Sequence, residues 1–233
     1  MSEASEKVQG VNQLALFPLP LVLLPNEFLP LHIFEPRYRQ MLHDVKLDRN
    51  LFGITFFDPQ ENFLDKPEIG TVGCVAEIRE EHTMPDESSN ILTSGVIRYR
   101  LLSYLDTATT PYFTAQVEFF EDNKDDSIDL KSIANEVFAL FERVAKAAFK
   151  IGGNRGSFPE IVQADPEQLS FLVTAAFNLD NELKYNMLEI VSTIERLQKL
   201  REILKQAVGK MEESAEIHKV AQTNGHSNKK IGL

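Results

Sequence analysis

The stretch Leu14–Leu42, LALFPLPLVLLPNEFLPLHIFEPRYRQML, combines short apolar runs, several prolines and one charged cluster. Proline lacks a backbone N–H donor, so Pro18, Pro20, Pro25 and Pro30 restrict the apolar pieces between them to short strands or sheet edges. The run is therefore not a membrane span. We predict that it forms two strands followed by a helix.

The second half of this stretch predicts a strand that leads directly into the helix. Phe28–Phe34 is almost continuously apolar, which is typical of a strand covered on both faces. Pro36 fits the first turn of a helix. Tyr38, Met41 and Leu42 then fall on one helical face, which can dock onto the strands.

Four segments together resemble a known family. The text LFPLPLVLLPNEFLPLHIFEPRYRQM resembles the start of the amino-terminal domain of Lon-type ATP-dependent proteases, which also occurs in stand-alone proteins. IGTVGCVAEI at Ile69–Ile78, SGVIRYRLLSY at Ser94–Tyr104 and ERLQKLREIL at Glu195–Leu204 follow in the family's order. The resemblance covers about residues 11 to 210, and it implies a β-rich, PUA-like pseudo-barrel lobe followed by a C-terminal α-helical lobe.

The pattern of elements independently indicates an α+β protein. Strand-like segments precede the charged break EDNKDD at Glu121–Asp126, and helical apolar spacing follows it. We expect a flexible leader at residues 1–12 and a β-rich lobe at residues 13–122. We expect a helical lobe at residues 127–213, and the end of the last helix with a disordered tail at residues 214–233.

Composition narrows the classes of function. The net charge of −11 over 233 residues disfavours nucleic acid as a partner, because such binding depends on Lys and Arg. The one cysteine, Cys74, excludes an internal disulfide and a cysteine-based zinc site, and it fits a reducing compartment. The polar, acidic start is neither a signal nor a transit peptide, so we expect a cytoplasmic protein with no membrane association.

No catalytic motif is evident. The glycine-rich IGGNRGS at Ile151–Ser157 lacks the spacing and the lysine of a phosphate loop, and the five histidines lack metal-ligand spacing. We interpret His32 as a core histidine and Cys74 as a small buried residue. The ATPase and serine-lysine protease domains of Lon have no counterpart here. We expect no enzyme activity, no cofactor, no metal and no catalytic residue.

One charged cluster and the abundant aromatics supply the candidate binding residues. Glu35, Arg37, Tyr38 and Arg39 follow the second strand, where arginine forks can grip peptide carboxylates or carbonyls. We favour the simpler interpretation, in which Glu35 pairs with one arginine and Tyr38 packs inward. The chain has 16 Phe, and the many that fall in the expected β lobe are too numerous for so small a lobe to bury entirely. The candidate peptide-binding residues are Phe34, Glu35, Arg37, Tyr38, Arg98, Tyr112 and Phe113.

The resemblance implies a non-catalytic protein that binds unfolded polypeptide or a protein client. It can act in proteolysis as an adaptor, with an ATP-dependent protease supplied in trans. An RNA-binding PUA-like module is the first alternative, which the acidic total disfavours. A hydrolase with a site not visible in the sequence is the second. The sequence leaves self-association open.

Overall fold

In the computed structural model, the described residues are 2–58, 66–105, 110–124, 127–151, 163–177 and 179–224, and they form six strands and six helices. Most of the glycine-rich segment at residues 151–157 and the tail beyond residue 224 lie outside the described residues. None of the described helices combines the length and the apolar content that a membrane span requires.

The opening stretch folds as two strands and a helix, as predicted. Strand β1 is Gln13–Leu19, strand β2 is Phe28–Ile33, and helix α2 is Pro36–Lys46 with the proline in its first turn. The apolar face of α2 consists of Tyr38, Met41, Leu42 and Val45, all buried in one cluster with Phe17 and Phe52. The proline and the helical spacing therefore predicted this unit correctly.

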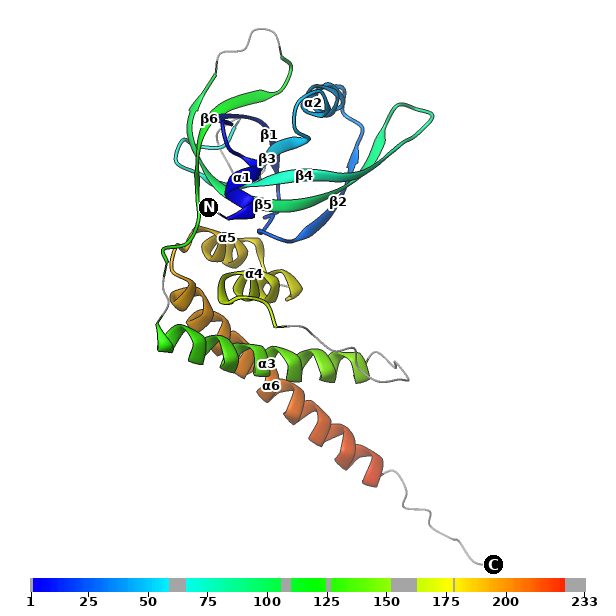
Figure 1. The fold of residues 1–233 in the computed structure, drawn as a ribbon. Helices are drawn as coiled ribbons and strands as arrows, with labels where there is room; N and C mark the ends of the chain where they lie inside the picture. The colour runs from blue at the N-terminus through cyan, green and yellow to red at the C-terminus, as the bar shows by residue number, and fades with distance from the viewer. Residues whose placement is uncertain are drawn as a thin grey trace, which may run out of the picture. The chain divides into compact units, whose positions relative to one another are not determined.

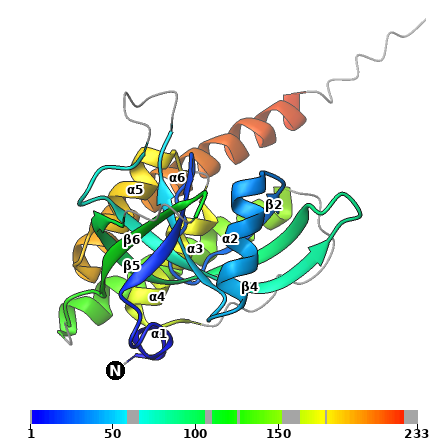
Figure 2. The same cartoon turned by 90° about the horizontal axis from the view of Figure 1, so that it is seen from above.

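The strands close into a pseudo-barrel. Strands β3 (Leu51–Phe56), β4 (Val72–Thr83), β5 (Ser89–Tyr104) and β6 (Phe113–Phe120) complete the sheet, whose order is β2-β5-β4-β3-β1-β6 with an additional β5–β6 pairing. That pairing closes the ring β5-β4-β3-β1-β6, and it leaves β2 beside the far end of the long β5. Figures 1 and 2 show the β4–β5 hairpin projecting beyond the other strands. The fold class is α+β, as predicted.

The amino-terminal residues differ from the expected flexible leader. Glu3–Lys7 form a short helix, α1, and the Ser2 hydroxyl caps it by accepting a bond from the Ser5 amide at 3.0 Å. Val8 is 5% exposed and packs in a cluster with Leu14 and Leu16. Ala4 and Val11 are partly buried and pack against the same cluster, so these few apolar side chains hold the amino-terminal residues against the barrel.

The helices divide between two compact units. Helices α3 (Ile128–Ile151), α4 (Pro166–Ala176), α5 (Asn181–Glu189) and α6 (Thr193–Asn224) follow the barrel. The first unit contains residues 1–124 and 171–193, and the second contains residues 125–170 and 194–233. The sequence analysis expected one helical lobe at residues 127–213, whereas residues 171–193 belong to the first unit.

Apolar packing explains why residues 171–193 join the first unit. Phe171 and Leu188 are buried in one cluster with Val22, Leu24 and Val72 of the β-rich region. Within the second unit, Glu136 of α3 pairs with Lys205 of α6 at 3.0 Å. Helix α6 continues to Asn224, inside the segment of residues 214–233 where the sequence analysis expected the end of the last helix and a disordered tail.

Candidate polypeptide-binding site

A hollow of about 480 Å³ in the first unit brings together five of the seven candidate residues. We call it the Phe34 cleft. It is lined by residues 17–20, 31–35, 37–38, 57–58 and 113, so Phe34, Glu35, Arg37, Tyr38 and Phe113 all contribute to it. Most of these side chains are apolar or aromatic, which is typical of a binding site for an apolar group.

The floor of the cleft is a packed aromatic pair. Tyr38 is 6% exposed, and its ring centroid lies 4.1 Å from that of Phe17. The Arg37 guanidinium lies over the Tyr38 ring, 4.5 Å from its centroid. Burial raises the pKa of Tyr38 above its usual value, although the nearby Arg37 charge opposes the shift. The Tyr38 hydroxyl therefore stays protonated and uncharged at neutral pH.

Two of the charged residues that line the cleft, Glu35 and Arg37, neutralise each other. Glu35 accepts a hydrogen bond from Arg37 Nε at 3.1 Å and pairs with Arg37 Nη2 at 2.9 Å. This is the simpler interpretation favoured from the sequence, with a local Glu–Arg pair and an inward-packed Tyr38. Because Arg37 is already engaged, the cleft presents no unpaired cation from this pair to an arriving carboxylate.

The rim of the cleft is exposed and aromatic. Phe34 is 62% exposed, and its ring stacks with the His32 ring at a centroid distance of 5.8 Å. His32 is exposed and shares a hydrogen bond of 2.8 Å between its Nδ1 and Asn90 Oδ1. The core-histidine interpretation was therefore wrong, and so was the expectation that β2 is covered on both faces. Phe28, Pro30 and His32 face outward from an edge strand.

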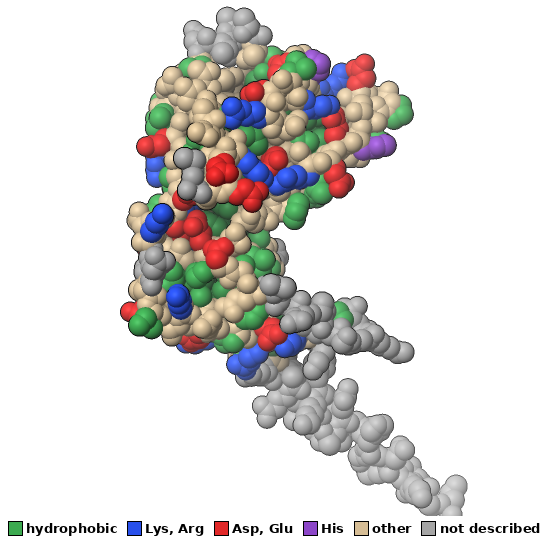
Figure 3. All heavy atoms as spheres, in the orientation of Figure 1, with side chains coloured by type: hydrophobic (Ala, Val, Ile, Leu, Met, Phe, Trp, Pro, Cys, Tyr) green, Lys and Arg blue, Asp and Glu red, His purple; other side chains and the backbone are tan. Residues whose placement is uncertain are grey.

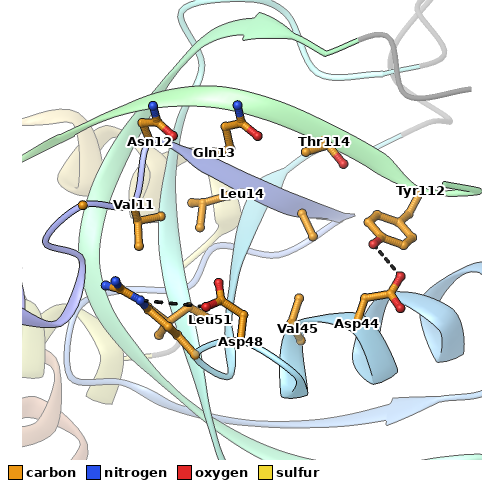
Figure 4. A pocket seen from close by; sticks show the side chains of 13 residues that line it. Val11, Asn12, Gln13, Leu14, Asp44, Val45, Asp48, Leu51, Tyr112 and Thr114 are labelled. Carbon is orange, nitrogen blue, oxygen red and sulfur yellow. Dashed lines mark hydrogen bonds and ion pairs between the residues drawn. The ribbon is translucent and has the colours of Figure 1, made fainter. Parts of the chain in front are cut away.

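Tyr112 lies outside the Phe34 cleft, in a neighbouring pocket of about 420 Å³ shown in Figure 4. Its hydroxyl donates to Asp44 Oδ2 of α2 at 2.7 Å, and Asp44 also accepts a bond from Gln40. Burial raises the pKa of Tyr112, and the bond to the Asp44 carboxylate raises it further. Tyr112 thus anchors the start of β6 to α2. Of the pair Tyr112 and Phe113, Phe113 lines the Phe34 cleft and Tyr112 does not.

Arg98 does not fit the predicted binding role, because its side chain is 1% exposed. Its guanidinium donates to the carbonyls of Leu188 at 3.0 Å and Ile190 at 2.6 Å, and it pairs with the Asp122 carboxylate. The Phe120 ring lies 4.7 Å from it. Arg98 is thus occupied by main-chain groups of residues 188 and 190 and does not face a bound peptide.

An ion pair between α2 and the β4–β5 hairpin has a pH dependence that can be tested. Burial of Glu81 alone raises its pKa, but hydrogen bonds from Lys46 and Ser89 outweigh burial and lower the pKa below its ordinary value of 4.5. A pKa lowered by folding stabilises the folded state above the unfolded pKa, and this contribution is lost as the pH falls through the folded pKa.

We therefore expect Glu81→Gln to lower the free energy of unfolding at neutral pH by less than about 1 kcal/mol, because Lys46 is partly exposed. The difference from the unmodified chain should shrink to zero in acid, below the folded pKa. Urea unfolding of both chains at neutral and acidic pH measures this. A difference that is the same at both pH values would contradict the assignment.

Neither the cysteine nor the possible metal ligands among the described residues form a catalytic arrangement. Cys74 is fully buried, and burial raises the pKa of its thiol, so the thiolate is disfavoured, as expected from the sequence. Within the described ranges, no group of three His, Cys, Asp or Glu side chains could hold a metal ion.

On the face of the first unit shown in Figure 3, acidic and basic side chains are interspersed. That face carries no continuous basic stripe of the kind that follows a phosphate backbone.

The fold identifies the structural class to which the protein belongs. The chain is similar to the solved Lon N-terminal domain protein of Xanthomonas campestris, with a TM-score of 0.59, 18% identity, and coverage of 82% of this chain and 97% of that one. It is also similar to the N-terminal domain of Mycobacterium avium complex Lon protease, with a TM-score of 0.62, 16% identity, and coverage of 83% and 98%. The architecture is thus that of Lon N-terminal domains.

Sequence relatives identify the family. The chain belongs to the family described as the ATP-dependent protease La (LON) substrate-binding domain, which matches residues 13–206. It is 24% identical over 211 residues to Lon protease 2 of Herpetosiphon aurantiacus, covering 89% of this chain and 26% of that protein. It is 28% identical over 207 residues to the Lon protease of Syntrophomonas wolfei, covering 86% and 24%. The chain therefore spans about a quarter of the length of these curated relatives.

The feature that sequence reasoning missed is the outward face of β2. Phe28, Pro30, His32 and Phe34 recur at every second position, which places them on one face of a strand. Leu29, Leu31 and Ile33 alternate with them and face the core. The signal was present, but rings on the outward face made the segment look uniformly apolar.

Proposed function

We propose that this chain recognises polypeptide substrates, and that it binds their apolar side chains in the Phe34 cleft. The observation that carries the proposal is the exposure of the Phe34 ring, 62%, beside a hollow with apolar walls. A large aromatic ring kept in water next to an apolar hollow is unfavourable for a free chain, and a bound apolar group removes both surfaces from water.

The proposed function is non-catalytic and serves proteolysis. The substrate-binding family to which the chain belongs supports a role in recognition, and the buried Cys74 thiol offers no nucleophile. The chain acts as an adaptor that presents bound clients to an ATP-dependent protease in trans. Addition of the chain should then accelerate degradation of a labelled unfolded client by a Lon-type protease. An unchanged rate would overturn the adaptor part alone.

The binding site itself is tested by Phe34→Ser. The chain contains no Trp, so the fluorescence of a Trp-bearing peptide reports binding without background from the protein. Burying a Phe side chain stabilises by about 1.5–3 kcal/mol, so removing the Phe34 ring should weaken binding by roughly tenfold or more. A titration of a Trp-containing, apolar, unfolded peptide with the two chains measures the ratio.

The matched control is Leu47→Ser. Leu47 is 77% exposed at the end of α2 and does not line the cleft, so its replacement should leave the affinity unchanged. Equal affinities for the Phe34→Ser variant and the unmodified chain, with both folded by circular dichroism, would remove the Phe34 cleft from the proposal. Equal weakening by both variants would indicate general surface adhesion instead.

A further inference from the structure

Among the described strands, β2 has one edge without a pairing partner. It is the terminal strand in the sheet order, and it pairs only with β5 among the described strands, from Phe28↔Ser94 to Ile33↔Ser89. An unpaired edge presents a row of main-chain donors and acceptors to any extended chain that can reach it.

Hydrogen bonds to β5 show which main-chain groups of β2 are already used. The Glu27 carbonyl accepts a bond from the Gly95 amide at 2.9 Å, and the Leu29 carbonyl accepts one from the Thr93 hydroxyl at 2.9 Å. In an antiparallel pair, the N–H and C=O of one residue point to the same side, and the side alternates along the strand. Phe28, Pro30 and His32 therefore direct their main-chain groups away from β5.

Pro30 agrees with this assignment. Proline has no N–H to donate, so it is tolerated where that group would point away from the ladder. The outward edge thus offers the carbonyls of Phe28, Pro30 and His32 and the amides of Phe28 and His32. Residues 31–34 also line the Phe34 cleft, so the free edge runs into the apolar hollow.

The charge of the chain favours a cationic partner over an acidic one. The net charge is −11. Glu80 lies on the same sheet face as Pro30, because Glu80 is opposite Leu92 and Leu92 is opposite Pro30. Glu80 is exposed and has no ion-pair partner among the described residues. Long-range attraction therefore raises the encounter rate of a basic segment and lowers that of an acidic one.

We propose that the client binds as an added β-strand on the outer edge of β2, and that the preferred client is an extended, basic segment with apolar residues at alternate positions. This inference rests on the proposed function, since it states how the polypeptide is held beside the Phe34 cleft. Main-chain hydrogen bonds to Phe28, Pro30 and His32 supply affinity that does not depend on client sequence. The alternate apolar side chains enter the cleft, and the net negative charge of the chain attracts the Lys or Arg between them.

Amide hydrogen exchange tests the proposed geometry directly. The probe is a nonapeptide. Every second residue of it is apolar, either Val or Trp, and the residues between these are Lys. Exchange at the Phe28 and His32 amides should be fast in the free chain and slower by roughly tenfold or more with saturating peptide. The Leu29 and Leu31 amides, which face β5, should be slow in both states. Bound peptide with no protection at Phe28 and His32 would overturn strand addition.

Backbone methylation of the probe provides a second test that leaves every protein side chain in place. Two versions of the peptide carry N-methyl groups on alternate residues, in opposite registers. An added strand turns only one register toward β2, so one version should lose binding and the other should keep it. Equal binding of the two versions contradicts strand addition even if Phe34→Ser still weakens binding, and that outcome leaves the proposed function intact.

A protein variant pair isolates one outward donor. His32→Pro removes the outward amide, whereas His32→Ala removes only the imidazole. We expect His32→Pro to bind the peptide roughly three- to tenfold more weakly than His32→Ala, because one hydrogen bond is lost. Equal affinities in folded variants contradict the geometry. Absence of any peptide binding to the unmodified chain overturns the proposed function as well.

Discussion

Replacing Arg98 with Met is expected to lower the free energy of unfolding by about 3–5 kcal/mol, because it leaves a buried charge without its partner. The Asp122 side chain is only 2% exposed, and its carboxylate pairs with Arg98 and accepts a bond from the Thr193 hydroxyl. The same variant removes the donors to the Leu188 and Ile190 carbonyls. Urea unfolding followed by circular dichroism measures the loss.

Two further variants separate the buried charge from simple loss of packing. Arg100→Met changes the next arginine on the same face of β5. The Arg100 side chain donates to the Gly70 carbonyl at 3.0 Å and is only partly buried, so its loss should cost about 1 kcal/mol. The double variant Arg98→Met/Asp122→Leu removes both buried charges and should be more stable than Arg98→Met alone. Equal losses for Arg98→Met and Arg100→Met would contradict a special contribution of the buried Arg98–Asp122 pair to stability.

A methyl group at position 95 is expected to have an effect of similar size. A Cβ on Gly95 would lie 2.1 Å from the Leu24 carbonyl oxygen, which is far inside van der Waals contact with main chain that cannot rotate away. The turn at residues 24–27 would have to move away from β5. That movement breaks the bonds from the Asn26 amide to the Gly95 carbonyl and from the Gly95 amide to the Glu27 carbonyl, both 2.9 Å. We expect Gly95→Ala to cost about 3 kcal/mol or more.

The matched control for Gly95→Ala is Gly209→Ala in helix α6. A Cβ at Gly209 meets no atom within 4 Å, and Ala is favoured over Gly in a helix interior by roughly 0.5–1 kcal/mol. The two substitutions, identical in chemistry, should therefore shift the urea midpoint in opposite directions. A Gly95→Ala chain with an unchanged midpoint would show that the turn at residues 24–27 adapts without loss, which would contradict the prediction.

The fold was predictable to a large extent because its signals are local. Pro36 and the spacing of Tyr38, Met41 and Leu42 predicted α2. The candidate site was predictable in part. Phe34, Glu35, Arg37 and Tyr38 are close in sequence and stay close in space, and Phe113 reaches them through strand pairing. Arg98 and Tyr112 were misplaced, because their partners are distant in sequence.

The sequence by itself determined the order of the elements, the family resemblance and the aromatic content of residues 28–34, since each depends on neighbouring residues alone. Only the tertiary structure decided that β2 is an edge strand, that His32 and Phe34 are exposed, and that Arg98 is buried beside Asp122. The physical reason is that burial and pairing depend on contacts between segments far apart in the chain. Leu188 and Ile190 meet Arg98 across about ninety residues, and no local pattern encodes that meeting.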